Sequence, residues 1–180
     1  QRPPLDHHVE KIFLKNMTNG LTYEYYNVKN TSGLFEDKPF KTETLNDPIN
    51  YYWGTGNVLN SGKKNYVGLK IKGFIKAPIS GNYKFRAYTD DGFKLYLDNK
   101  LIINSYFRQA RGTPRDSGDI ILEENKYYSI EVQWFEWTGY ATVQLLWLLP
   151  PSLNIIRTKR SVSTWNIIPK TAFYLYAIKP

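Results

Sequence analysis

Two adjacent carboxylates, Asp90 and Asp91, lie in a short turn signal that ends in Gly92, and alternating apolar and polar residues flank them at 83–88 and 93–98. Neighbouring side chains of a flat strand point to opposite faces, so a flat strand could not aim both acids at one point, whereas a turn or a strained peptide could. Paired carboxylates repel each other unless a cation lies between them, and oxygen ligands suit Ca²⁺. The sequence therefore predicts a calcium site at the rim of a β-sandwich, with sugar hydroxyls completing the shell of the ion. A turn with two solvated acids is the alternative.

Alternation with a period of two dominates the chain, and helical periodicity is almost absent. Turn signals rich in Gly, Asn and Pro separate the alternating segments, which are 67–71, 83–87, 93–97, 128–134 and 141–147. Many short strands at this spacing predict an all-β antiparallel sandwich or barrel. Three stretches lack the pattern: 28–65, expected to be a long polar connection, the basic segment 107–117, and 150–165. Loops on a rigid β scaffold often carry the binding residues.

The composition limits the classes of partner. The 180 residues have the size of one domain, and their formal charge is +8. A basic balance permits nucleic acid or acidic glycans, but no helix, zinc-ligand spacing or aromatic RNA-binding signature supports nucleic acid, so we expect none. No apolar run approaches the length of a membrane span, so we expect no direct membrane insertion. The absence of Cys excludes structural disulfides and thiol chemistry.

The order of eight segments along the chain points to a known family. These segments are Gly20–Tyr26, Ile49–Gly56, Val67–Pro78, Gly81–Phe85, Thr89–Asp98, Asn125–Tyr128, Ala141–Trp147 and Ile168–Pro169. In this order they closely resemble the protective antigen 14-kDa domain, a β-sandwich found in adhesins, glycosidases, glycosyltransferases and toxins. The resemblance covers residues 20 to about 176. It implies a single jelly-roll-like antiparallel sandwich at 20–180, preceded by residues 1–19 as an N-terminal arm or first edge strand.

The resemblance also implies a ligand set. In lectin-like members of that family, an Asp–Asp pair with a cis peptide bond supplies two calcium ligands, and a later loop supplies a third, often Asn. Asp90 and Asp91 match the pair, and Glu136 occupies roughly the position of the Asn. The implied metal ligands are therefore Asp90, Asp91 and Glu136. A third carboxylate is still a suitable calcium ligand, but three acids neutralise more of the ion's positive charge, so the ion attracts the hydroxyls of a neutral sugar less strongly.

Residues near this site are candidates for contacting a sugar. Trp137 and Tyr140 could stack on the flat apolar face of a pyranose, although core packing is an equal alternative. Thr138 and Arg108, the latter in the basic segment, complete the expected ligand-binding set. The remaining tryptophans of the strand-like segments are expected in the core: Trp53, Trp134 and Trp147.

No residues suggest catalysis. The only histidines, His7 and His8, lie in the N-terminal arm, and no nucleophile motif surrounds any Ser. Adjacent acids on one turn do not give the separation of about 5–9 Å that glycoside hydrolysis uses. We predict a non-catalytic, calcium-dependent carbohydrate-binding module of a larger secreted or cell-surface protein. The alternatives are a metal-independent interaction module of a toxin-type assembly, and an accessory polysaccharide-sensing module of a glycosidase or receptor.

Overall fold

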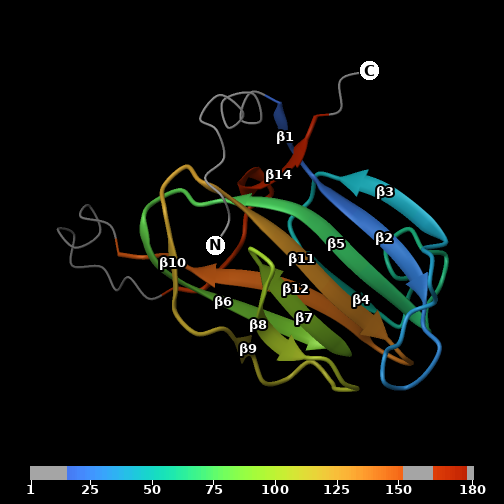
Figure 1. Cartoon of the computed structure of the whole chain (residues 1–180). Coiled ribbons are helices and arrows are strands. Elements are labelled where there is room, and N and C mark those ends of the chain that lie inside the picture. The colour runs from blue at the N-terminus through green and yellow to red at the C-terminus, as the bar shows by residue number, and fades with distance from the viewer. Residues whose placement is uncertain (1–15, 152–163, 178–180) are drawn as a thin grey trace.

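The structure, a computed structural model, describes residues 16–151 and 164–177 (Figure 1). His7, His8 and most of the segment 150–165 lie outside these ranges. The strands in chain order are β1 Met17–Asn19, β2 Leu21–Asn27, β3 Lys41–Leu45, β4 Asn50–Gly54, β5 Val67–Lys76, β6 Gly81–Asp90, β7 Gly92–Leu97, β8 Lys100–Ser105, β9 Arg115–Asp116, β10 Ile120–Leu122, β11 Tyr127–Glu136, β12 Ala141–Leu148, β13 Asn166–Ile167 and β14 Phe173–Tyr176. A short 3₁₀ turn, Lys170–Ala172, precedes β14.

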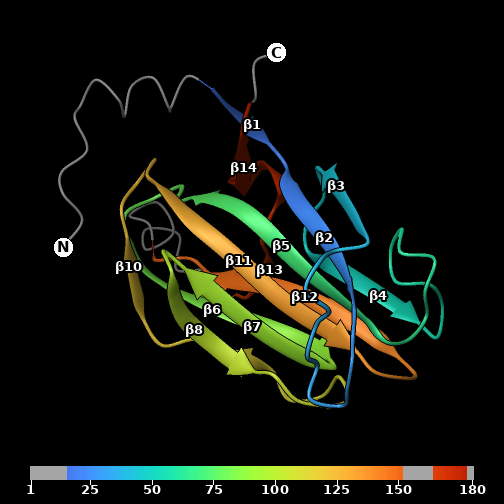
Figure 2. The same ribbon diagram turned by 45° about the vertical axis from the view of Figure 1, so that its right-hand side comes forward.

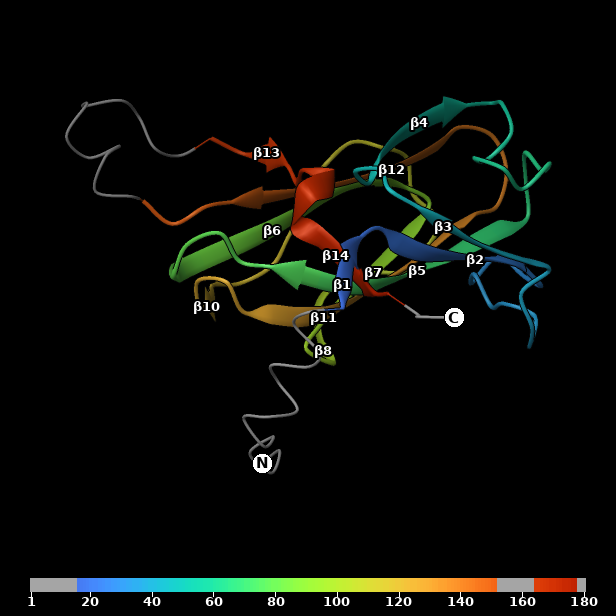
Figure 3. The same cartoon turned by 90° about the horizontal axis from the view of Figure 1, so that it is seen from above.

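These strands form two antiparallel sheets that pack face to face, which confirms the predicted all-β sandwich (Figure 3). The larger sheet has the order β1-β14-β5-β11-β7-β8, and β2 joins it by pairing with β5 and β3. The smaller sheet has the order β10-β6-β12-β13, with β4 on β12 and β9 on β6. Edge strand β1 pairs with β14, so both ends of the described chain lie beside each other (Figure 2). No helix among the described residues is long and apolar enough to cross a membrane.

The alternating segments form the strands because their apolar positions all face the space between the sheets. Leu69 and Ile71 of β5 and Val132 of β11 are fully buried or nearly so, and they pack against Phe85 of β6 in one core cluster. Each fully buried large apolar side chain stabilises the fold by roughly 1.5–3 kcal/mol. The three tryptophans expected in the core lie there: Trp134 and Trp147 are buried, and Trp53 is partly buried against the cluster.

The expectation of a long connection over 28–65 is wrong in part, because this stretch contains β3 and β4. Among the described strands, β3 pairs with β2 alone. Its sequence is mostly polar, and none of its residues is fully buried. Strand β4 is five residues long, and within residues 16–151 and 164–177 its one partner is β12. Edge strands of this kind carry little of the alternation that reveals strands in a sequence.

The Asp90–Asp91 turn is a crossing between the two sheets. Strand β6 belongs to the smaller sheet and β7 to the larger one, and Asp91 is the single residue between them. Strands β11 and β12 make the second crossing at the same end, through residues 137–140. Two chain crossings therefore meet at one end of the sandwich.

Candidate metal centre

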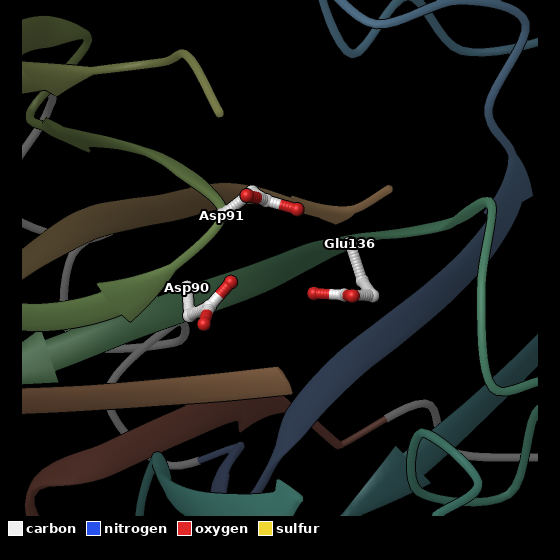
Figure 4. A group of neighbouring side chains, drawn as sticks. All are labelled: Asp90, Asp91 and Glu136. Atoms are coloured by element: carbon white, nitrogen blue, oxygen red, sulfur yellow. The ribbon is translucent and has the colours of Figure 1, made fainter. Parts of the chain in front are cut away.

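The structure brings together the three carboxylates that the resemblance implies as ligands. Asp90 ends β6 and pairs with Thr142 of β12, whereas Glu136 ends β11. Asp91 lies on the crossing between the sheets, and its N–H donates to the carbonyl of Phe135 over 3.0 Å. Figure 4 shows the carboxyl groups of Asp90 and Glu136 pointing toward each other, with that of Asp91 beside them.

The cluster is compact and buried. One carboxyl oxygen from each residue lies within 4.8 Å of those from the other two. The exposed fractions are 9% for Asp90, 6% for Asp91 and 0% for Glu136. The peptide bond between Asp90 and Asp91 is cis, as the resemblance implies. Within the described chain, this is the group of carboxylates whose spacing suits a metal ion.

Backbone groups from two loops orient the carboxylate of Asp91. The N–H of Gln109 donates to Oδ1 over 2.9 Å, and the N–H of Trp137 donates to Oδ2 over 2.8 Å. The hydroxyl of Thr89 donates to the Asp91 carbonyl over 2.8 Å. Hydrogen bonds from backbone N–H groups to a carboxylate are charge-assisted and stronger than neutral ones. Asp91 therefore fixes both loops to the end of the sandwich.

Glu136 has the opposite environment. Neither of its carboxyl oxygens finds a hydrogen-bond partner in the described chain, although the side chain is fully buried. A buried ionised carboxylate without a partner is strongly unfavourable, so such a group is either protonated or paired with a cation. The negative charges of the two neighbouring aspartates oppose its ionisation, and the guanidinium of Arg108 acts the other way with a smaller effect.

The electrostatics follow from this crowding. Burial raises the pKa of Glu136 to about 9, and the negative charges of Asp91 and Asp90 add to the rise. Burial raises the pKa of Asp90 to about 7, with a further contribution from the charge of Asp91. Burial also raises the pKa of Asp91, against the opposing effects of the N–H groups of Trp137 and Gln109 and of the Arg108 guanidinium. A cation between the three groups would reverse these effects because it favours the charged forms.

The donor set fits a hard divalent cation. Ca²⁺ takes six to eight oxygen ligands and tolerates irregular geometry, and carboxylates are its commonest protein ligands. Asp90, Asp91 and Glu136 offer oxygens only, and the described chain places no nitrogen or sulfur ligand among them. Both oxygens of Glu136 are free of protein donors, so both are open to a cation.

The four residues expected to contact a sugar lie around the cluster, and they differ in how exposed their side chains are. Tyr140 is 58% exposed, Thr138 is exposed, and Trp137 is partly buried. Arg108 is exposed on the connection between β8 and β9, beside Gln109. The structure thus places all four at the end of the sandwich that carries the acids.

Three further residues at this end carry no signal in the sequence. Gln109 supplies a backbone donor to Asp91, and such a role is independent of residue type. Tyr66 has a positive φ of 57° and packs its ring edge-to-face against Trp137, with centroids 4.6 Å apart. Phe107 is 49% exposed next to the Asp90–Asp91 crossing. Their positions depend on which loops meet in space.

Comparison with known proteins places this chain among related domains. The sequence model of the PA14 domain matches residues 17–155. The anti-sigma-I factor RsgI3 of Acetivibrio thermocellus is 28% identical over 129 residues, which are 72% of this chain and 19% of the relative. The chain therefore spans about a fifth of the length of that relative.

Solved structures show the same fold. An anti-sigma factor domain-containing protein superposes with a TM-score of 0.68 and 26% identity, over 88% of this chain and 49% of its own. A PA14 sugar-binding domain from an RTX adhesin gives a TM-score of 0.65 and 15% identity, over 88% and 99%. The A domain of Epithelial Adhesin 9 from Candida glabrata, in complex with Galβ1-4GlcNAc, gives 0.65 and 12% identity, over 90% and 91%.

Proposed function

Because the chain belongs to the PA14 domain family, we propose that it is a non-catalytic module that binds carbohydrate with the help of Ca²⁺. One observation carries this proposal: the fully buried carboxylate of Glu136 has no protein partner and faces two aspartates. Asp90, Asp91 and Glu136 would bind the ion. A bound Ca²⁺ would supply positive charge and open coordination positions for sugar hydroxyls.

The chain's own residues prepare the site for that role. The N–H groups of Gln109 and Trp137 keep the Asp91 carboxylate in one orientation without a metal, so little ordering is needed when a ligand binds. Trp137 and Tyr140 offer rings beside the acids for the apolar face of a sugar. Arg108 is exposed at the same rim and could contact hydroxyl or carboxylate groups.

The sugar-binding neighbours support carbohydrate as the ligand. An adhesin's PA14 domain is described as sugar-binding, and the Candida glabrata domain is a complex with a galactose-containing disaccharide. Both share the fold of this chain at low identity, so the particular sugar is not transferred. We propose a secreted or cell-surface location, where glycans are accessible, within a larger protein.

The test is calorimetric titration of Ca²⁺ combined with a glycan array that is read once with calcium and once with a chelator. We expect heat from calcium binding and glycan signals that disappear with chelator. Asp91→Ala should lose both, whereas Asp119→Asn, at an exposed acid on the connection between β9 and β10, should retain both. No heat from calcium, together with an unchanged array after chelation, would instead favour a metal-independent interaction module of a toxin-type assembly.

A second candidate function follows from the relatives. One is an anti-sigma-I factor of which this chain matches 19%, and another is an anti-sigma factor domain-containing protein. The domain would then sense polysaccharide for a regulatory protein instead of attaching a cell to a surface. A transcription reporter driven by the cognate sigma factor distinguishes the two. Sensing requires the reporter to respond to added polysaccharide in a calcium-dependent way, whereas adhesion predicts no response.

A further inference from the structure

Exposed apolar side chains gather at the end of the sandwich that carries the acid cluster. Nine large apolar residues of the described chain are substantially exposed. Six of them lie on strands or loops toward this end: Leu34, Phe40, Tyr52, Tyr66, Phe107 and Tyr140. A concentration of exposed apolar groups at one end marks a binding surface more often than a scattered distribution does.

One side of the acid cluster is formed by Tyr66 and Trp137. Their rings pack edge-to-face, and the N–H of Tyr66 donates to the Trp137 carbonyl over 3.0 Å. Tyr66 remains 44% exposed and adopts a positive φ, which is uncommon for an aromatic residue. Tyr140 follows in the same loop as Trp137 and is more exposed still. We call Tyr66, Trp137 and Tyr140 the tyrosine–tryptophan flank.

The other side is formed by Phe107. Its backbone nitrogen lies close to Gly92, and a Cβ added to Gly92 would come within 3.1 Å of it. The guanidinium of Arg115 lies 5.5 Å from the centre of the Phe107 ring. We call Phe107 the phenylalanine flank.

The two flanks attach to opposite oxygens of one carboxylate. Oδ2 of Asp91 accepts from Trp137 of the first flank, and Oδ1 accepts from Gln109, two residues after Phe107 of the second. Along the larger sheet, the strand order β5-β11-β7-β8 puts Tyr66, which precedes β5, and Phe107, which follows β8, on opposite sides of the Asp91 crossing. A ligand centred on the cluster can contact a ring in both directions.

We propose that the site binds an internal stretch of a linear polysaccharide, with one sugar over the acid cluster and its neighbours in the chain on the two flanks. This inference rests on the proposed carbohydrate-binding function and adds the class of glycan. A module that reads a terminal sugar needs ring contacts on one side only. Rings on both sides fit a chain that continues in both directions, because every pyranose presents an apolar face.

The experiment measures affinity against chain length in the presence of Ca²⁺. The probes are β-1,4-linked gluco-, xylo- and galacturono-oligosaccharides of one to six units. We expect the six-unit member of at least one series to bind at least tenfold more tightly than its monosaccharide. Tyr66→Asn and Phe107→Ser should each weaken the six-unit complex about fivefold to tenfold and change monosaccharide affinity little. Asn tolerates the positive φ of Tyr66, so this variant removes the ring and keeps the backbone.

Ile121→Ala is the matched control, because Ile121 is 74% exposed on β10 at the opposite end. It should leave every affinity unchanged. Affinity that does not depend on length, a loss confined to one flank, or calcium binding without affinity for any probe would overturn the inference and leave the metal site intact. Absence of calcium binding by the unmodified protein would instead remove the proposed function on which the inference rests.

Discussion

The carboxylates of Asp91 and Glu136 differ in how the protein satisfies them. Each oxygen of Asp91 accepts a backbone hydrogen bond, so this group can be ionised without a metal at modest cost. Glu136 is buried with both oxygens unpartnered, so its ionised form needs a cation. The two residues should therefore respond differently to neutral substitutions of the same shape.

We predict that Glu136→Gln abolishes calcium binding and stabilises the metal-free protein at pH 8. At pH 8 the metal-free folded protein must keep Glu136 protonated, because its pKa is about 9, whereas the unfolded chain ionises it. The amide is neutral in both states, and its nitrogen can donate to the neighbouring aspartates. Thermal unfolding with chelator should show a higher Tm than the unmodified protein, and calorimetry should show no calcium heat. Glu123→Gln, an exposed acid, is the control. A lower Tm for Glu136→Gln in chelator would contradict the account of Glu136 as a buried acid whose ionisation favours the unfolded chain at pH 8.

For Asp91→Asn we expect weaker calcium binding, by more than about tenfold, because one ligand charge is lost. The amide nitrogen also cannot accept a hydrogen bond, so either Gln109 or Trp137 loses its acceptor. Hydrogen exchange should be faster at one of these two backbone amides than in the unmodified protein. Unchanged protection at both amides would show that the loops do not depend on Asp91.

Among the strands and loops, the two crossings between sheets decide where the acids lie. Strand β6 ends with Asp90 in one sheet, and β7 begins with Gly92 in the other. The backbone of Gly92 runs against the ring of Phe135 in β11, and an added Cβ would lie 2.3 Å from that ring. A side chain at position 92 would therefore overlap the Phe135 ring unless the ring or the backbone moved.

We predict that Gly92→Ala lowers the free energy of unfolding by about 1–3 kcal/mol, because the methyl group overlaps the buried ring of Phe135. For a domain of this size, the Tm should fall by roughly 2–4 °C for each kcal/mol. Gly118→Ala is the control, since no atom lies within 4 Å of an added Cβ there. Equal Tm values for the two variants would show that the crossing can widen without cost.

For the domain as a single folding unit, the acid cluster links stability to pH. The pKa of Asp90 rises from 3.8 to about 7 on folding, and that of Glu136 rises from 4.5 to about 9. The folded metal-free protein thus retains protons that the unfolded chain releases. This contribution to stability is complete below about pH 4 and is lost progressively as the pH rises through 7 and 9.

We predict that calcium reverses this trend, because the ion and the protons compete for the same oxygens. Saturation at 100 times Kd would stabilise the fold by about 2.7 kcal/mol, which corresponds to a rise in Tm of roughly 5–10 °C. Differential scanning calorimetry from pH 5 to 9, with calcium or chelator, should show the difference growing with pH. A calcium effect of equal size at pH 5 and pH 9 would contradict proton competition.

The sequence alone determined the fold and the identity of the candidate ligands. Period-two alternation, as in 67–71 and 128–134, indicates strands with one buried face, and the whole set of such segments predicted a sandwich or a barrel. The family resemblance favoured the sandwich. The Asp90–Asp91 pair and Glu136 were identifiable because their residue types and order resemble those of a family. The edge strands β3 and β4 were missed because their side chains are partly solvated on both faces.

The resemblance implied that the three acids form one ligand set, and only the tertiary structure decided that the ring of Tyr66 and the backbone of Gln109 lie beside them. These residues lie on connections far apart in the chain, and their approach depends on which strands cross between the sheets. The burial that leaves Glu136 without a partner also depends on this packing. A local sequence pattern indicates which face of one segment is buried. The distance between two loops depends instead on how all the strands that connect them pair and pack.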